Sequence, residues 1–391
     1  MLLQSFFPLF LLIYEFCAYM SNDMYLPALI SIEQDFATTT NLVQTSIVVW
    51  YAGLALPQLY AGALSDRFGR RIVLLWGGTV FFLSTVGCAL STHIYFFLLC
   101  RFLEGAGICS MLVSGYSAVH ESFDDAKAIR IIAWMSCITV LAPMFGPLMG
   151  SYLLEFSGWR SIFWSISISS AAAIAALFFI MPETNQSPCH KQKPDIYLKL
   201  LSNRQFVMSS LTLGLLIAVM IAWMTASPFL LMQEEHLSAM EFGWAQVPIF
   251  AAYGISTRLV GFLHEHYGSK ILLKSGFSII FFAGLYLTAG NYLAFDSMHR
   301  FIVPLAIYAS GFGLLSAPLN RIVFTSTNEK KGTVTAMFYL IEMGTACLIT
   351  SGLSLISFYH LVVCLILCSS LSLFLSQYKR LRTGDPHNIK A

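Results

Sequence analysis

Long apolar runs are the feature of this chain that most limits what it can fold into. Runs of about 20 residues, the length of a helix that spans a bilayer, follow one another along the chain. Short polar segments separate them. We predict membrane-spanning helices at residues 6–28, 42–63, 72–91, 95–118, 131–154, 161–181, 205–231, 243–263, 271–292, 301–324, 334–357 and 360–378. The sequence therefore predicts an all-α integral membrane protein with twelve transmembrane helices.

The composition excludes a water-soluble enzyme. Of the 391 residues, 57% are hydrophobic and only 11% are charged, whereas an average soluble domain has about 25% charged residues. Twelve spans leave no room for a sizeable soluble domain. The net charge of +2 gives no basic surface for nucleic acid. The cysteines do not have the spacing of metal ligands, so we expect neither a metal site nor a disulfide framework.

A polar stretch at mid-chain divides the spans into two sets of six. We assign residues 1–181 to an N-terminal six-helix half, 182–204 to a cytoplasmic linker, 205–378 to a C-terminal six-helix half and 379–391 to a cytoplasmic tail. With the N-terminus inside, 17 of the 22 Lys and Arg residues fall in cytoplasmic segments, two in outer loops and three inside spans. The positive-inside rule then places both termini in the cytoplasm.

The two halves repeat a short motif. The segment from Gly62 to Leu74, after the second span, aligns without gaps to the segment from Gly261 to Leu273, after the eighth. The alignment preserves glycine, an acid, glycine and a base in the same order. Duplicated six-helix halves around a site at the membrane midplane are the plan of the major facilitator fold.

Ionisable residues inside spans are the strongest functional signal, because each costs roughly 2.5 kcal/mol or more at a helix centre unless it faces a cavity or a partner. Glu15 and Asp23 are separated by two helical turns, about 12 Å along the axis, so both can line one cavity at two depths. Arg101 lies at a similar depth to Asp23, and we predict that these two are partners. The candidate proton- and substrate-binding residues are Glu15, Asp23, Arg101, Glu104 and Glu342.

Other interpretations stay open for part of this set. Arg101 can instead hold the helices together, and Glu104 and Glu342 can be protonated structural groups. Arg258 and Arg321 lie near the cytoplasmic face, where their side chains can snorkel to the interface. The candidate cavity residues are Tyr19, Asn22, Trp223 and Met224; the last two, on the seventh span, either line an adaptable apolar pocket or pack against lipid.

Two backbone motifs indicate moving parts. In the first, Asp66 is expected to cap the third span, its glycines permit a tight turn, and its arginines stay in the cytoplasm. It consists of Gly62, Asp66, Arg67, Gly69, Arg70 and Arg71. The second, in the fifth span, predicts a kink or hinge, with close helix packing as the alternative. It consists of Pro143, Gly146, Pro147 and Gly150.

A carboxyl group in a poorly hydrated cavity can hold either a proton or a cationic ligand. A site that holds one or the other is sufficient for antiport, because the two ligands then favour opposite conformations. The chain contains no Gly-Lys dipeptide and therefore no P-loop. We expect no cofactor and a transport cycle driven by the proton gradient.

These motifs carry a family resemblance. The segment from Gly62 to Arg71 resembles the loop signature of the major facilitator superfamily, Arg101 to Gly107 the fourth-span motif of its proton-linked members, and Ala142 to Gly150 the fifth-span motif of its antiporters. Further segments in both halves, such as the one from Ser21 to Met24, are similar to bacterial MdfA-type multidrug/proton antiporters.

The resemblance implies a role for each matching residue. Glu15 and Asp23 match the membrane acids of that family for substrate and proton, Arg101 its fourth-span arginine, Asp66 its gating-loop acid and Arg321 its tenth-span arginine. The chain departs from the family in having acids, where the family has amides, at Glu104 and Glu342, and in carrying Arg258.

The function expected from this resemblance is proton-coupled multidrug efflux. The protein would export lipophilic cationic or neutral compounds by alternating access, as a monomer in the lipid bilayer of the bacterial inner membrane, with small molecules and protons as its partners. The alternative is a dedicated proton-linked exporter, or importer, of one metabolite such as a siderophore. A membrane enzyme or receptor fits poorly, because no loop is long enough to form a separate domain.

Overall fold

The computed structural model describes residues 6–184, 195–293, 296, 298–327, 329 and 331–352. The predicted twelfth span at 360–378, the predicted tail at 379–391 and the middle of the predicted linker lie outside the described residues.

The first half of the chain folds into helices that match the first six predicted spans. They are α1 (Phe7–Asp23), η2 (Leu26–Ala28), α2 (Leu29–Asp35), α3 (Thr40–Ala55), α4 (Gln58–Phe68), α5 (Arg70–Leu90), α6 (Ile94–Ser122), α7 (Asp125–Ser157) and α8 (Trp159–Ile180). The second predicted span is formed by two helices, α3 and α4, with a bend of 49° between them. Helices are the expected result in apolar surroundings, because a helix satisfies its own backbone hydrogen bonds.

The second half continues in the same way. Its elements are α9 (Asp195–Ser202) in the predicted linker, α10 (Arg204–Pro228), η3 (Phe229–Glu234), α11 (Ala239–Tyr292), η4 (Met298–Ile302), α12 (Val303–Thr325) and α13 (Lys331–Ser351). Within the described residues, eight helices are long and apolar enough to cross a membrane, or nine if α3 and α4 count as one span. The 54 residues of α11 include a break at Gly268, so this element covers the eighth and ninth predicted spans.

The repeated motif breaks the chain at the same place in each half. Gly69 has a φ of 101° and Gly268 a φ of 73°, and these two glycines are aligned in the repeat. Side chains with a Cβ rarely adopt this left-handed conformation. Each glycine therefore ends one helix and lets the next begin at once, between α4 and α5 and inside α11.

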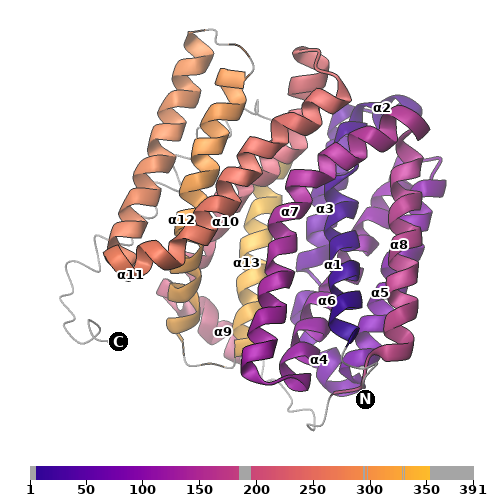
Figure 1. Ribbon diagram of the computed structural model, residues 1–391, viewed down its shortest axis with the longest axis vertical. Helices are drawn as coiled ribbons and strands as arrows, with labels where there is room; N and C mark the ends of the chain where they lie inside the picture. Colours follow the sequence, from indigo (N-terminus) through magenta and orange to yellow (C-terminus); the bar gives the residue numbers. More distant parts are fainter. Residues whose placement is uncertain are drawn as a thin grey trace.

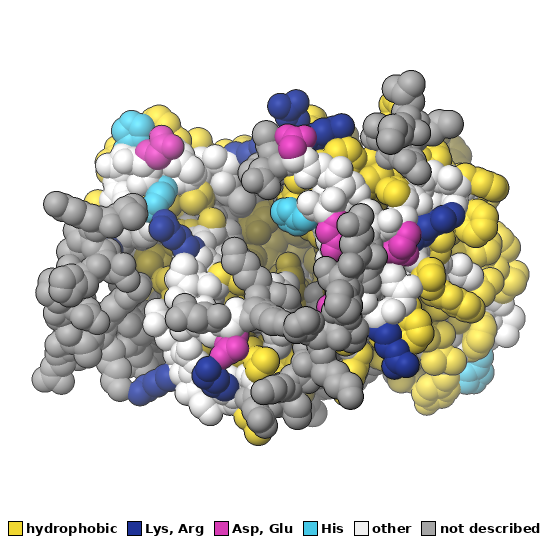
Figure 2. Space-filling model, turned by 90° about the horizontal axis from the view of Figure 1, so that it is seen from below, with side chains coloured by type: hydrophobic (Ala, Val, Ile, Leu, Met, Phe, Trp, Pro, Cys, Tyr) yellow, Lys and Arg dark blue, Asp and Glu magenta, His cyan; other side chains and the backbone are white. Residues whose placement is uncertain are grey.

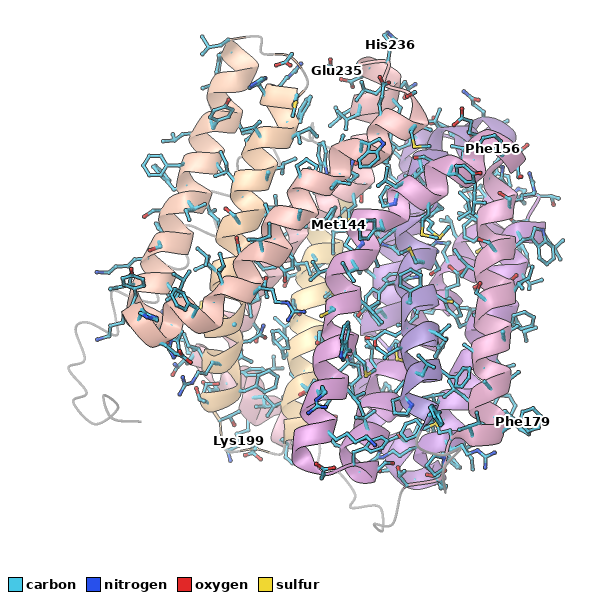
Figure 3. All side chains as sticks on the ribbon, viewed as in Figure 1. Met144, Phe156, Phe179, Lys199, Glu235 and His236 are labelled. Carbon is cyan, nitrogen blue, oxygen red and sulfur yellow. The ribbon has the colours of Figure 1, made fainter. Side chains whose placement is uncertain are left out.

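The two sets of helices lie side by side, with α7 and α11 adjacent between them (Figure 1). We call the end of the molecule that carries Glu235 and His236 the upper face, and the end that carries Phe179 and Lys199 the lower face (Figure 3). The outer surface of the bundle exposes large apolar side chains such as Trp76, Phe179 and Leu348, as expected where helices face lipid.

The two halves pack closely against each other near the upper face. On the upper side, Gly243 of α11 packs directly against Leu148 of α7, and the Ser151 hydroxyl donates a hydrogen bond of 2.6 Å to the carbonyl of Ala239. Figure 2 shows the lower face, which is hollowed between the halves, with apolar side chains inside the hollow and charged side chains around it. The hollow in the lower face therefore lies between the two halves.

Candidate substrate and proton site

The candidate residues gather where α1, α3 and α6 of the first half approach α10 and α13 of the second. Two contacts cross between the halves here. The Tyr51 hydroxyl of α3 lies 4.0 Å from the sulfur of Met224 in α10, and the thiol of Cys347 in α13 lies 3.6 Å from the carbonyl oxygen of Val48. The site is therefore built by both halves, although its charged groups are mainly on α1 and α6.

Arg101 is fully buried and forms its ion pair with Glu104, one turn further along α6. The predicted partners Arg101 and Asp23 therefore form no direct ion pair, although Arg101 interacts electrostatically with Asp23. The helix places Glu104 on the same face as Arg101, and both terminal nitrogens of the guanidinium also bind α1. They reach the carbonyl of Ser21 at 2.9 Å and the side-chain oxygen of Asn22 at 3.0 Å.

Asn22 links the arginine to Asp23. While its oxygen accepts from Arg101, its amide nitrogen donates to a carboxylate oxygen of Asp23 at 3.3 Å and to the Tyr51 hydroxyl at 3.4 Å. Asp23 is 3% exposed. Asp23 and Arg101 thus share a hydrogen-bond network without direct contact, and the sequence-predicted cavity residue Asn22 is its central member.

Glu15 is fully buried two turns below Asp23 on α1. One carboxylate oxygen accepts a hydrogen bond of 3.0 Å from the Tyr116 hydroxyl of α6. The other oxygen has no hydrogen-bond partner within the described residues. An unpartnered buried carboxylate oxygen is costly unless it is protonated or binds a ligand. Tyr19, one turn along α1, interacts electrostatically with both Glu15 and Asp23.

Glu342 brings a third acid from the opposite half. It lies on α13 and is 7% exposed, and within the described part of the chain it has neither a hydrogen bond nor an ion pair. It interacts electrostatically with Tyr253 of α11 and with Tyr339, one turn before it on α13. Tyr339 also interacts with Glu15, so one tyrosine lies between acids of the two halves.

Trp223 and Met224 are buried at 0% and 5% exposure, so the alternative that they pack against lipid is wrong. The Trp223 indole donates a hydrogen bond of 2.7 Å to the side-chain oxygen of Gln246 in α11, and its ring packs against Phe301 with centroids 6.2 Å apart. Trp223 therefore connects α10 to α11 and η4 within the second half. Met224 instead faces Tyr51 across the boundary between the halves.

The turn between α4 and α5 differs from the expectation in one respect. Asp66 does not cap α5. Glu183, which follows α8, accepts hydrogen bonds from the backbone N–H groups of Arg70 at 2.8 Å and Arg71 at 3.2 Å. Asp66 lies in the last turn of α4 and instead forms an ion pair of 2.5 Å with Arg70. Arg70 also binds Glu121 of α6 at 3.0 Å.

The other basic residues of the predicted motifs lie at the surface. Arg67 stacks on the ring of Phe68, and Arg71 donates to the carbonyl of Phe178. Arg258 and Arg321 are exposed. Arg258 is not simply a snorkelling side chain, because its guanidinium donates a hydrogen bond to the thiol of Cys137 in α7, across the boundary between the halves. A Cβ added at Gly62 would meet no atom of the described residues within 4 Å, so no close contact seen in this part of the chain requires this glycine.

The proline and glycine motif of the fifth span packs α7 against the end of α1. Helix α7 is continuous from Asp125 to Ser157, with Pro143 and Pro147 inside it, and it is bent along its length (Figure 1). A Cβ at Gly146 would collide with Asp23, and one at Gly150 would collide with the carbonyl of Met24. Close packing is therefore observed, and the hinge stays a prediction.

Sequence reasoning missed the tyrosines that surround the acids and the cap from Glu183. A tyrosine inside a span carries a hydroxyl that needs a polar partner, so its presence mid-span was a usable signal. The missed site residues are Tyr51, Tyr116, Tyr253 and Tyr339.

The sequence profile of the Major Facilitator Superfamily matches residues 11–350. The chain belongs to this superfamily. It is therefore a multi-pass membrane transporter of small molecules, and not an enzyme. Two solved structures share the fold of this transporter at 14% identity. They are a D-xylose-proton symporter, with a TM-score of 0.74 over 94% of this chain and 97% of the other, and a bacterial homologue of the human lysosomal transporter Spinster, inward-facing and occupied, with a TM-score of 0.73 over 97% of both.

Curated relatives resemble the transporter more closely in sequence. The multidrug transporter MdfA of Yersinia pestis bv. Antiqua (strain Angola) is 35% identical over 344 residues, which are 86% of this chain and 83% of the relative. MdfA of Escherichia coli O157:H7 is 33% identical over 341 residues, with the same coverage. The multidrug resistance protein MdtM of Salmonella typhimurium (strain LT2) is 32% identical over 340 residues, 86% of this chain and 82% of the relative.

Proposed function

We propose that this transporter is a proton-coupled multidrug efflux antiporter that exports lipophilic cationic or neutral compounds by alternating access. The observation that carries the proposal is Glu15, whose fully buried carboxylate leaves one oxygen without a partner among the described residues. Such a group must be neutralised, either by a proton or by a cationic ligand. The multidrug transporters among the relatives support the class of cargo.

The cycle follows from this competition. Cargo enters the central cavity from the lower face and displaces a proton from Glu15 or Asp23, and the halves rock to release the cargo at the opposite face. Protons from that side then reset the carrier. The excess of Lys and Arg in segments on one side supports a cytoplasmic lower face in a bacterial inner membrane. The proton gradient supplies the energy, and no cofactor is needed.

The test uses the purified transporter in proteoliposomes with an imposed pH gradient and a pH-sensitive dye inside. Lipophilic cations, neutral drugs and siderophore-like compounds are added in turn, and proton movement is read from the dye. We expect many unrelated compounds to move protons with the native protein. Glu15→Gln and Asp23→Asn should each lose most of this response. Glu155→Gln, at an exposed site on α7, is the matched control and should respond normally.

Two results would change the conclusion. Full pH-dependent transport by the Glu15→Gln/Asp23→Asn double variant would contradict the assigned acids. A response to one compound class alone would support the alternative of a dedicated exporter. Gel filtration and thermal unfolding of each variant separate a loss of coupling from a loss of folding.

A further inference from the structure

Two buried cysteines face each other where α5 packs against α6. These helices form an antiparallel hairpin joined by residues 91–93, and its two sides pack closely. A Cβ added at Gly107 would lie 2.8 Å from the Cβ of Phe81, so these two positions are opposite each other. Seven residues are about two helical turns and return to the same face of a helix. Seven residues further along α5 and seven residues back along α6, the same register places Cys88 opposite Cys100.

The contacts of the two cysteines agree with this register. Their thiols interact by a side-chain hydrogen bond, and a Cβ added at Gly87, next to Cys88, would lie 2.6 Å from the sulfur of Cys100. Both cysteines are free thiols in this structure and are buried, at 0% and 4% exposure. A single buried thiol behaves as a small apolar side chain, but two facing thiols can also be joined by a bond.

The pair lies toward the upper face. Arg160, in the first turn of α8, donates a hydrogen bond of 3.0 Å to the carbonyl of Ser91, which directly follows α5. Because Phe156 at the end of α7 marks the upper face (Figure 3), this contact places the loop between α5 and α6 there. Leu99, directly before Cys100, is exposed on the outer surface of the bundle, so a lipophilic reagent can approach through the bilayer. In the proposed orientation the upper face is on the outer side of the membrane, where disulfides form and persist.

We propose that Cys88 and Cys100 are a redox-active dithiol, which a small organic disulfide converts into a disulfide bond between α5 and α6. One cysteine, as thiolate, attacks a sulfur of the organic disulfide and releases its first thiol. The second cysteine then attacks the mixed disulfide and releases the second thiol. The two cysteines lose two electrons and two protons, and the organic disulfide accepts them to become two thiols. A reducing thiol reverses the exchange.

The bond would stabilise the part of the first half that carries the buried ion pair. Cys100 directly precedes Arg101, whose partner Glu104 lies one turn further along α6. A disulfide restricts the unfolded chain between residues 88 and 100, while the packed helices keep a contact that they already have. Since α5 and α6 both belong to the first half, the bond does not join the two halves. The proposal is therefore independent of the proposed cargo and of proton coupling.

The test compares the oxidised and reduced forms of the purified transporter in detergent. The oxidant is 2,2′-dithiodipyridine, a lipophilic aromatic disulfide; remaining thiols are then alkylated, and peptides are identified by mass spectrometry. We expect peptides joined through Cys88 and Cys100, and a rise of roughly 3–10 °C in the midpoint of thermal unfolding. Dithiothreitol should reverse both. Cys88→Ser should lose both effects, whereas Cys109→Ser, at a buried cysteine elsewhere on α6, is the matched control and should keep them.

Two results would overturn the proposal. Recovery of Cys88 and Cys100 as free thiols, or each with its own pyridylthio group, would mean that the two sulfurs do not form a bond. A verified cross-link that leaves the midpoint at its reduced value would contradict the stabilising role. Both comparisons use the native chain, so a folding defect of the Cys88→Ser variant does not affect them.

Discussion

At the scale of single residues, the network around Arg101 decides which acids are free to bind protons and cargo. The arginine is neutralised by Glu104 on its own helix and anchored to the end of α1 through Ser21 and Asn22. Among the described residues, hydrogen bonds link Arg101 to Asp23 through Asn22, and no hydrogen bond or ion pair links Arg101 to Glu15. The same pairing makes Arg101 a structural residue, because removing one member of a buried ion pair leaves the other charge exposed to an apolar interior.

We predict that Arg101→Met destabilises the transporter by about 3–5 kcal/mol, the cost of an uncompensated buried charge. The double variant Arg101→Met/Glu104→Leu should recover most of this loss, because neither charge then remains. Thermal unfolding of the purified variants in detergent measures the order of stabilities. A double variant no more stable than Arg101→Met would show that Glu104 is not the partner that matters.

At the scale of helices, glycines position the elements in two different ways. Gly69 and Gly268 take backbone conformations that favour glycine, whereas Gly146 and Gly150 allow α7 to touch the backbone of α1. Gly69 and Gly268 therefore end helices, whereas Gly146 and Gly150 let α7 pack directly against Asp23 and Met24.

The break in α11 can be tested within one motif. Gly268→Ala should cost about 1–2 kcal/mol, because its φ of 73° places a Cβ against the following carbonyl. Gly261→Ala, at a helical position with no close neighbour, should be neutral or slightly stabilising. Midpoints of thermal unfolding compare the two variants, and equal midpoints would refute the assigned role of Gly268.

The contact between α7 and α1 links packing to function. Gly146→Ala would place a methyl group against Asp23, so we predict a loss of proton-coupled transport that exceeds the loss of stability. Gly344→Ala in α13, where no atom of the described residues lies within 4 Å of the added Cβ, is the matched control. Proton movement in proteoliposomes, compared with the unfolding midpoint of each variant, measures both effects. Native transport by Gly146→Ala would mean that α7 does not position Asp23.

Much of the helical architecture could be predicted from the sequence, because apolar length and helix-breaking glycines are local signals. The first eleven predicted spans coincide with helices or with parts of α11. Which side chains contact one another in the folded chain was less predictable. Asp66 was the nearest acid in sequence to the start of α5, yet Glu183, more than 100 residues away, caps it, because only the folded chain brings α8 beside α5. Arg101 likewise had several acids at suitable depth.

At the scale of the whole molecule, the α7–α11 contact near the upper face joins the two halves. The α7–α11 contact joins the halves where Ser151 and Ala239 meet, while the lower face is hollowed (Figure 2). Alternating access requires this contact to open, because cargo can leave at the upper face only if α7 and α11 separate there.

A disulfide across the α7–α11 contact should therefore stop transport. We predict that Ser151→Cys/Ala239→Cys forms a cross-link under mild oxidation and abolishes proton-coupled transport, and that a reducing agent restores it. The matched control is Asn203→Cys/Ser326→Cys, a pair joined by a hydrogen bond of 2.8 Å between the residue before α10 and the residue after α12, whose cross-link should leave transport intact. Mass spectrometry of peptides identifies each disulfide, and proteoliposome assays before and after reduction measure the block. Transport that continues through the verified α7–α11 cross-link would mean that the halves do not separate at this contact during the cycle.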